Sequence, residues 1–320
     1  MKQSTRGDVL MRSHSIAISE LPRLLSHIDP VNREVWLKVA MGVHAEFGEQ
    51  GFTHWDTWSQ GAPSYRARDA RAVWRSIHPG KVGFGTVVHL AKQGGWCPDP
   101  NAPQPSEEEI EKRARRAEKA KRQAERQQAR QHTEAARKAR ELVDSAFPET
   151  GQHAYLVKKR VGGHGIFSDG FRLLVPMRDA EGKLWNLQRI DPRGNKRFLR
   201  GGRVAALFHQ IGQPIDQAVV ICEGYATGAT LHESTGHAVA VAFNAGNLKP
   251  VAKALREKHP DARLIIAADN DRHTPGNPGL TKANEAALAV GGLVAAPEFD
   301  DNEPGTDWND WYNNRREALA

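Results

Sequence analysis

Hydrophobic positions in the first third of the chain recur every three to four residues. Such spacing places apolar side chains on one face of a helix. The series is Leu21, Leu24, Leu25 and Ile28, followed by Val35, Trp36, Val39 and Ala40. The pattern predicts a flexible N-terminus over residues 1–18 and a separate all-α domain over residues 19–97.

Tryptophan is concentrated in this helical region. Its five tryptophans are Trp36, Trp55, Trp58, Trp74 and Trp96. Large rings in a small helical domain either fill its core or stack on nucleic-acid bases. We favour core packing, because the rings accompany the helical apolar series.

A proline-rich break and a long charged segment come next. Pro98, Pro100, Pro103 and Pro105 are incompatible with a helix interior. Ser106 and Glu109 then have the spacing of a capping box. Residues 107–142 contain twelve Lys or Arg against eight Asp or Glu and have no sustained apolar heptad. Residues 98–146 therefore predict a break followed by a solvated connecting helix, which we favour over a nucleic-acid-binding arm.

The region from 147 to 212 has a different pattern. Short apolar segments, 171–177, 185–190 and 196–199, are separated by the turn-forming sequences DAEG and DPRGN. This alternation predicts a small mixed β subdomain.

Continuous apolar runs and helical segments then alternate to residue 300. Runs of this kind are typical of parallel strands that are covered on both faces. The predicted strands are 218–222, 238–243, 263–268 and 293–296, and the predicted helices are 225–234, 250–258 and 280–290. The expected fold is α/β, with a doubly wound, Rossmann-like, four-stranded parallel sheet over 213–300 and a C-terminal segment over 301–320.

Composition narrows the class of protein. The 320 residues carry a net charge of +7, which suits a partner that bears phosphates. Cys97 and Cys222 are far apart, so neither a disulfide framework nor a cysteine-based zinc site is expected. There is no apolar run of membrane-spanning length and no secretory signal, so we expect a cytoplasmic protein that does not bind membranes.

Acidic residues follow two of the predicted strands. Glu223 comes directly after one strand, and Asp269 and Asp271 follow another. Ligands bind at the carboxyl ends of parallel strands, and clustered carboxylates need a cation such as Mg²⁺ to neutralise them. Asp269 alone would more simply be a helix cap. The joint pattern predicts a phosphoryl-transfer site in which two metal ions are held by these acids. The residues expected to contact phosphates are Gly224, Asn244, Gly246 and Asn247.

The sequences CEGYATGATL, FNAGNL and AADNDRHTPGNPGLTKANEAA resemble the Toprim domain of primases, topoisomerases and some nucleases. That resemblance implies that Glu223, Asp269 and Asp271 are catalytic and hold Mg²⁺ or Mn²⁺. Segments 153–161 and 173–199 are similar to primase cores of plasmids and phages. WLKVAMGVHAEFG, WDTWSQ and GTVVHLAKQGGW resemble a helical domain found beside such cores.

The primase resemblance implies further site residues and partners. Basic residues expected to face template and nucleotide are Lys158, Arg189, Lys196 and Arg197. GTDWNDW is similar to the family's late acidic motif, which makes Asp307 and Asp310 secondary metal ligands, and Lys282 is a candidate phosphate contact. The implied partners are single-stranded DNA, ribonucleoside triphosphates and, because the chain has no GxxxxGK[ST] motif, a separate replicative helicase.

Three other functions compete with primer synthesis. A Toprim nuclease would use the same metal cluster for hydrolysis. A topoisomerase needs a tyrosine nucleophile beside the acids, and Tyr225 is better explained as packing at a helix start. A non-catalytic DNA-binding adaptor for replication proteins could keep the fold alone, although the presence of all three acids argues against it.

Overall fold

The computed structural model describes residues 16–77, 82–213 and 217–318. The chain divides into two compact units, Met1–Gln127 and Gln128–Ala320, which are described separately. Most of the predicted flexible N-terminus lies outside the described residues. In the part of the chain that the structure describes, no helix is both long enough and apolar enough to cross a membrane.

The first unit is helical, as predicted. Its elements before the long helix are η1 (Ile18–Glu20), α2 (Leu21–Leu25), α3 (Arg33–Phe47), η2 (Gly48–Gly51), α4 (Phe52–Ser59), α5 (Ala67–Ser76) and α6 (Phe84–Gln93). Trp55, Trp74 and Trp96 are buried in its core. The indole of Trp36 donates to Ser59 Oγ and that of Trp58 to the Ile28 carbonyl. These contacts confirm core packing for the tryptophans.

Helix α7 (Glu107–Asp144) begins at the predicted capping box. The backbone N–H of Ser106 donates to the Glu109 carboxylate at 3.1 Å, and that of Glu109 donates to Ser106 Oγ at 3.2 Å. The first turns pack on the helical unit through Arg113, whose guanidinium pairs with Glu46 at 3.1 Å and lies over the Phe47 ring. Past this docking site, residues 121–131 are all exposed, and His132 is partly buried.

The second unit starts with an antiparallel sheet in the order β1-β2-β3-β4-β5. The strands are β1 (Phe147–Pro148), β2 (Phe167–Ser168), β3 (Leu173–Arg178), β4 (Leu184–Ile190) and β5 (Lys196–Phe198), and α8 (Ala154–Lys159) lies between β1 and β2 in sequence. Ala139, near the end of α7, packs against Leu174 and Leu187 on one face of this sheet. The small β subdomain is therefore a meander with one face covered by α7.

The other sheet has the order β10-β9-β7-β8-β6. Its strands are β6 (His209–Ile211), β7 (Ala218–Cys222), β8 (Ala238–Val241), β9 (Arg263–Ala267) and β10 (Leu293–Ala295). Strands β7 to β10 pair in parallel, whereas β6 pairs antiparallel with β8 at the edge. The sequence predicts four strands here, and the structure adds a fifth. Strand β6 was missed because three residues, His209–Ile211, carry too short an apolar pattern.

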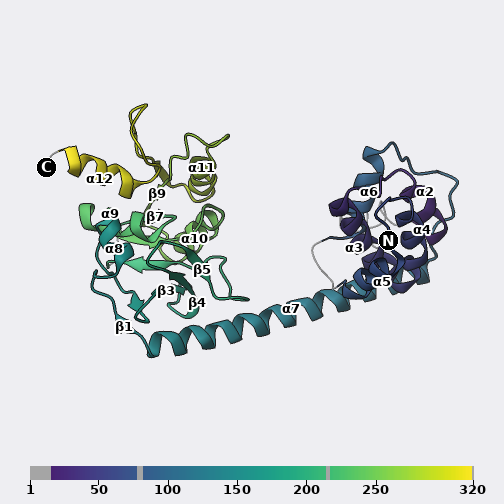
Figure 1. The fold of residues 1–320 in the computed structure, drawn as a ribbon, viewed down its shortest axis with the longest axis horizontal. Helices are drawn as coiled ribbons and strands as arrows, with labels where there is room; N and C mark the ends of the chain where they lie inside the picture. The colour runs from purple at the N-terminus through teal and green to yellow at the C-terminus, as the bar shows by residue number, and fades with distance from the viewer. Residues whose placement is uncertain (1–15, 78–81, 214–216, 319–320) are drawn as a thin grey trace. The chain divides into compact units, whose positions relative to one another are not determined.

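Helices cover both faces of the parallel strands (Figure 1). They are α9 (Tyr225–Thr235), α10 (Ala245–Lys258) and α11 (Pro278–Val290), and α12 (Trp308–Ala318) follows the sheet. Val219 and Ile221 face the core shared with α10 and α11. Val220 and Cys222 point to the opposite core, which contains residues of α9 and of the antiparallel sheet. This alternation explains the continuous apolar run of β7, since both of its faces are buried.

Candidate active site

Three acidic side chains lie at the carboxyl ends of two neighbouring strands. Glu223 directly follows β7, and Asp269 and Asp271 follow β9 by two and four residues. Cys222 and Ala267 are register partners in these parallel strands, so both chains leave the sheet at the same edge. The charges of Glu223 and Asp271 both raise the pKa of Asp269, so the three acids lie near enough to interact electrostatically. We call these three residues the acidic edge.

The surroundings of the acidic edge disfavour the ionised form of its carboxyl groups. Burial, and secondarily the charge of Asp271, raises the pKa of Glu223 to about 7. Burial raises the pKa of Asp269 to about 8, with further contributions from Glu223, Asp307 and Asp271. Low-dielectric surroundings and like charges both disfavour an ionised carboxylate. Without a metal, the carboxyl groups of Glu223 and Asp269 therefore tend to keep their protons. A bound cation would favour their ionised form.

Unsatisfied oxygens support a cation at this edge. Glu223 Oε1 and Asp269 Oδ1 are buried and have no hydrogen-bond partner. Buried acceptors without a partner are costly, and oxygen-only ligands match the preference of Mg²⁺. Within residues 16–77, 82–213 and 217–318, no three acidic, histidine or cysteine side chains are close enough to hold an ion as they stand. Carboxylates that repel one another have to be drawn together by the ion itself.

The loop that carries Asp271 is fixed by polar contacts. Asn277 has a left-handed backbone (φ 41°), caps α11, and its Oδ1 accepts the Asp271 N–H at 2.9 Å. Asp271 Oδ2 accepts the Gly279 N–H at 3.0 Å, at the start of α11. Asn270 Oδ1 accepts from Asn277 Nδ2 at 2.9 Å. Sequence reasoning missed Asn270, Asn277 and Gly279, although Asn277-Pro278 is a recognisable helix-start signal.

Gly279→Ala is expected to disrupt this loop and to lower the activity of the predicted phosphoryl-transfer site at least about tenfold. A methyl group at this position would lie 2.6 Å from the Asp269 carbonyl oxygen and 3.0 Å from Asp271 Oδ2, so the loop backbone has to move. Displacement of a positioned catalytic group by a fraction of an ångström is enough to slow phosphoryl transfer. The measurement is the rate of Mg²⁺-dependent phosphoryl transfer, with Gly85→Ala as the control, because a methyl group at Gly85 meets nothing within 4 Å. Equal activity of Gly279→Ala and the unmodified protein would contradict the tight packing.

Two further acids lie at the start of α12. Asp307 Oδ1 caps that helix by accepting the Asp310 N–H at 2.9 Å, and Asp307 also contributes to the raised pKa of Asp269. Asp310 Oδ1 accepts from Lys159 Nζ at 3.0 Å, and its Oδ2 accepts the Thr306 N–H at 3.3 Å. Asp307 is thus electrostatically part of the acidic edge, whereas both oxygens of Asp310 already have protein partners.

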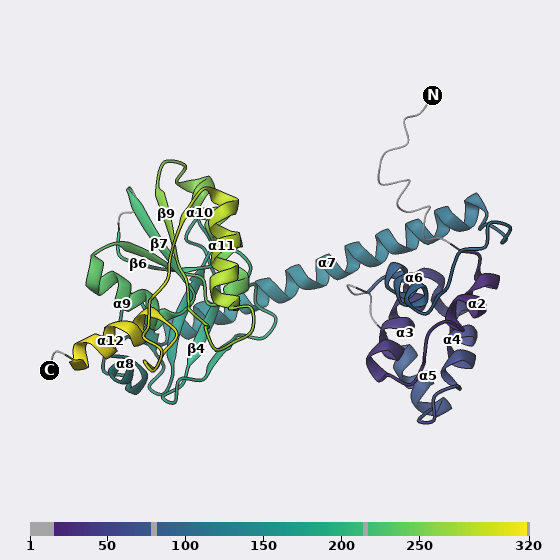
Figure 2. The ribbon, with the colours of Figure 1, turned by 90° about the horizontal axis from the view of Figure 1, so that it is seen from above.

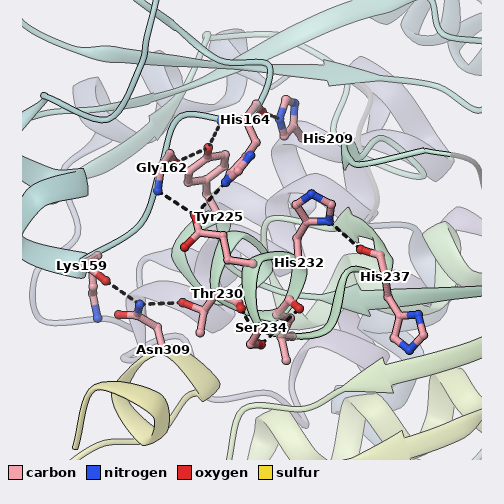
Figure 3. Close-up of polar contacts among 12 residues, drawn as sticks. Lys159, Gly162, His164, His209, Tyr225, Thr230, His232, Ser234, His237 and Asn309 are labelled. Carbon is pink, nitrogen blue, oxygen red and sulfur yellow. Dashed lines mark hydrogen bonds and ion pairs between the residues drawn. The ribbon is translucent and has the colours of Figure 1, made fainter. Parts of the chain in front are cut away.

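Asn309 fixes α12 against the rest of the unit. It is 1% exposed, and its Nδ2 donates to the Lys159 carbonyl at 2.7 Å and to Thr230 Oγ1 at 2.8 Å (Figure 3). Figure 2 shows the resulting arrangement, with α12 beside α8 and α9. This contact places Lys159 beside Asp310 and within the field of Asp307. The sequence pointed to Lys158, the exposed neighbour, and missed Lys159.

Lys196 is the predicted basic residue that lies near the acidic edge. Lys196 as a whole residue is exposed, but desolvation of its amine lowers the pKa of that group, and the carboxylates of Asp307 and Asp269 oppose the shift. Side chains alternate across a strand, so Lys196 and Phe198 share one face of β5 and Arg197 points to the other. Arg197 is the register partner of Arg189. The structure therefore separates Arg189 and Arg197 from Lys196.

The remaining predicted phosphate contacts lie in different surroundings. Asn244 caps α10, and its Oδ1 accepts the Asn247 N–H at 3.1 Å. Asn247 is 3% exposed, and its amide bonds to the backbone of residues 206, 207 and 242, so we remove it from the phosphate-binding set. Lys282 pairs with Glu285 at 2.8 Å on the surface of α11.

The two glycines differ little in their surroundings. A methyl group on Gly224 would lie 3.4 Å from Thr227 Oγ1 and 3.8 Å from Lys196 Nζ, which are ordinary contacts. One on Gly246 would lie 3.3 Å from Asn244 Oδ1. Neither position forbids a side chain within the protein, so any need for glycine here must come from a ligand.

Tyr225 packs at the start of α9, as predicted. It is buried, its hydroxyl donates to the Gly162 carbonyl at 3.1 Å and accepts the His164 N–H at 2.7 Å (Figure 3). Burial raises the pKa of this hydroxyl. Tyr225 therefore ties the loop after α8 to α9, and both hydrogen bonds of its hydroxyl are made within the fold.

Comparison with known families assigns the region that contains the acidic edge. Residues 218–317 match the Toprim domain family. They form a Toprim domain. Residues 21–91, in the helical unit, match the family Primase C terminal 2 (PriCT-2). Both matches confirm the resemblances found in the sequence, and the Toprim domain includes α12 with Asp307 as well as the parallel strands.

Curated relatives extend the comparison. Two proteins named DNA primase TraC from Escherichia coli are 42% identical over 183 residues and 41% identical over 226 residues, which cover 54% and 67% of this chain. The matched parts are only 17% and 15% of those relatives, so the chain spans about a sixth of their length. Among solved structures, the primase fragment of the bacteriophage T7 primase-helicase protein aligns at 19% identity with a TM-score of 0.40, covering 51% of this chain and 71% of the fragment.

Proposed function

We propose that this chain is a DNA primase, which synthesises short RNA primers on single-stranded DNA during replication of a plasmid or phage. The observation that carries the proposal is the acidic edge of the Toprim domain, where Glu223 and Asp269 have buried, unpartnered oxygens. The PriCT-2 match and the names of the relatives, DNA primase TraC, favour primer synthesis over other Toprim reactions.

Nucleotidyl transfer joins two nucleotides with loss of pyrophosphate. The 3′ hydroxyl oxygen of one nucleotide attacks the α-phosphorus of the next, a P–O bond forms, and the bond to pyrophosphate breaks while the hydroxyl proton departs. Glu223 would either complete the metal site or accept this proton. Lys196, as the cation beside the acids, is suited to hold a negatively charged phosphate.

Glu223, Asp269 and Asp271 are the proposed ligands of Mg²⁺ or Mn²⁺, with Asp307 as a further candidate and two ions as the expected number. When bound, the metal would neutralise phosphate charge and lower the cost of ionising these carboxyl groups. Asp310 is less suited, since both of its oxygens have protein partners. The proposed phosphate contacts that remain are Gly224, Asn244, Gly246 and Lys282.

Template and partners follow from the same proposal. Single-stranded DNA and ribonucleoside triphosphates are the substrates, and a separate replicative helicase is the expected partner. Lys196 and Lys159 are proposed to face the nucleotide, since Asp307 lies near both amines. Lys158, Arg189 and Arg197 are proposed to contact template farther from the acids.

The test is incubation of the full chain with single-stranded DNA, labelled ribonucleotides and Mg²⁺. A primase is expected to give labelled oligoribonucleotides that depend on both template and metal. Shortening of end-labelled DNA without such products would identify a Toprim nuclease. Binding of DNA with neither reaction, in the presence of Mg²⁺ or Mn²⁺, would identify a non-catalytic adaptor.

A further inference from the structure

Helix α7 carries a line of positive charge on its exposed surface. Arg115, Lys119, Arg122 and Arg126 follow one another at spacings of four, three and four residues. Residues at these spacings lie one above another on the same side of a helix. The four are all exposed, with Arg115 and Arg122 side chains 78% and 70% accessible, and they line one shallow hollow on the helix surface. We call this set the basic stripe.

Among the described residues, the basic stripe takes no part in the contacts that dock α7 on the helical unit. The contacts that dock α7 on the helical unit come from Arg113 and Arg116, whose side chains reach Glu46 and the backbone of residues 45 and 46. Residues 117–126 offer only small or polar side chains, so no core forms there. Within the described residues, ion pairs are found for Arg115 with Glu111 and Arg122 with Glu118, but none for Lys119 or Arg126.

Electrostatics makes the stripe unfavourable for an isolated helix. Each of its members has a like charge three or four residues away, and such neighbours destabilise a helix. A freely solvated helix gains from alternating acids and bases on each side, as in the two i,i+4 pairs that are present. A polyanion along the stripe would turn the repulsion into attraction. No Phe, Tyr, Trp or His occurs between Arg115 and Arg126, so bases have no ring to stack on along the stripe and the phosphates remain the target.

We propose that the basic stripe of α7 binds the phosphate backbone of single-stranded DNA without reading its sequence. The identity of the strand rests on the proposed function, in which this DNA is the template. The stripe spans the twelve residues from Arg115 to Arg126, or roughly 16 Å at a rise of 1.5 Å per residue, which suits a short stretch of backbone. The stripe would increase the affinity of the protein for template and would take no part in catalysis.

The test compares DNA binding by two charge-matched variants of the full chain. The stripe variant combines Lys119→Gln, Arg122→Gln and Arg126→Gln. The control combines Lys121→Gln, on the opposite side of α7, with Arg75→Gln and Lys92→Gln, which lie on exposed surfaces of the same unit. Glutamine is a good helix former, and circular dichroism checks that both variants keep their helix content. Binding to a labelled oligodeoxynucleotide is measured over a range of salt, without nucleotides or Mg²⁺.

Each phosphate contact on a single strand contributes about −0.7 to the slope of log affinity against log salt. The stripe variant is expected to lose about two units of that slope, and about tenfold or more in affinity at low salt, while the control keeps both values. Equal slopes for the two variants, or a loss seen only with duplex DNA, would overturn the proposal. Because the assay involves no catalysis, its failure leaves the primase assignment to be judged by primer synthesis alone.

Discussion

Asp269→Asn is expected to abolish primer synthesis and, at the same time, to make the metal-free protein more stable. Asparagine keeps the shape of the side chain but removes the charge that would hold a metal, so we expect activity to fall by about three orders of magnitude. Asp269 is partly exposed as a residue, but burial of its carboxyl group raises the pKa of that group to about 8. Removing that charge is expected to stabilise the fold by on the order of 2 kcal/mol above pH 8, after allowance for solvent screening.

The measurements are primer yield and the Tm of the metal-free protein in the same buffer. Asp261→Asn is a matched control, since Asp261 is exposed before β9, at the opposite end of that strand from Asp269. The control should change neither quantity. A variant at Asp269 that made normal primers, or that unfolded at a lower temperature than the unmodified protein, would refute the role given to this carboxylate.

Stability of the metal-free protein is expected to fall as pH rises from about 4 to 8. In the unfolded chain Asp269 loses its proton near its ordinary pKa of 3.8, whereas the folded protein keeps the proton until about pH 8. The folded state binds more protons over this window, so each step up in pH favours unfolding. Glu223 acts in the same direction between about 4.5 and 7. Mg²⁺ competes with these protons, so it should raise Tm much more at pH 8.5 than at pH 6.

Other carboxylates have the opposite dependence: the Arg137 guanidinium lowers the pKa of Glu134 to about 2, so the ionised form of that carboxylate favours the folded state as pH rises. The comparison that isolates the acidic edge is therefore the difference in Tm between the unmodified protein and Asp269→Asn at each pH, with and without Mg²⁺. That difference should grow with pH when metal is absent and reverse its sign when metal is present. A difference that stays constant from pH 5 to 8.5 would contradict the raised pKa of Asp269.

The elements that the sequence predicted correctly are those whose pattern lies within a few adjacent residues. Ala218–Cys222 is buried on both faces, so its apolar run is continuous, and the acids that follow it and β9 mark the strand ends directly. Ser106 and Glu109 gave the start of α7, because both members of a capping box lie within four residues. Where burial and capping are local, composition and spacing are enough to locate the element.

Residues whose position depends on contacts between distant segments could not be predicted from the local sequence. Lys159 enters the site only because Asn309, 150 positions later, holds its carbonyl. The adjacent residue Lys158 has the same chemistry, and nothing in the local sequence distinguishes the two. Likewise Asn247 has the residue type of a phosphate contact, but its partners at 206 and 207 come from a segment whose position no periodic pattern reveals.

Strand β6 also determines where this protein can be divided. A boundary at 212/213 separates His209–Ile211 from β8, to which it pairs, and leaves the backbone groups of Ala238–Val241 open along one side. All four residues of β8 are apolar and buried in the intact chain, so the exposed edge would be both hydrophobic and ready to add another strand. We therefore expect a fragment that starts after β6 to self-associate through this edge. Strand β6 therefore protects the edge of β8 from pairing with a strand of another chain.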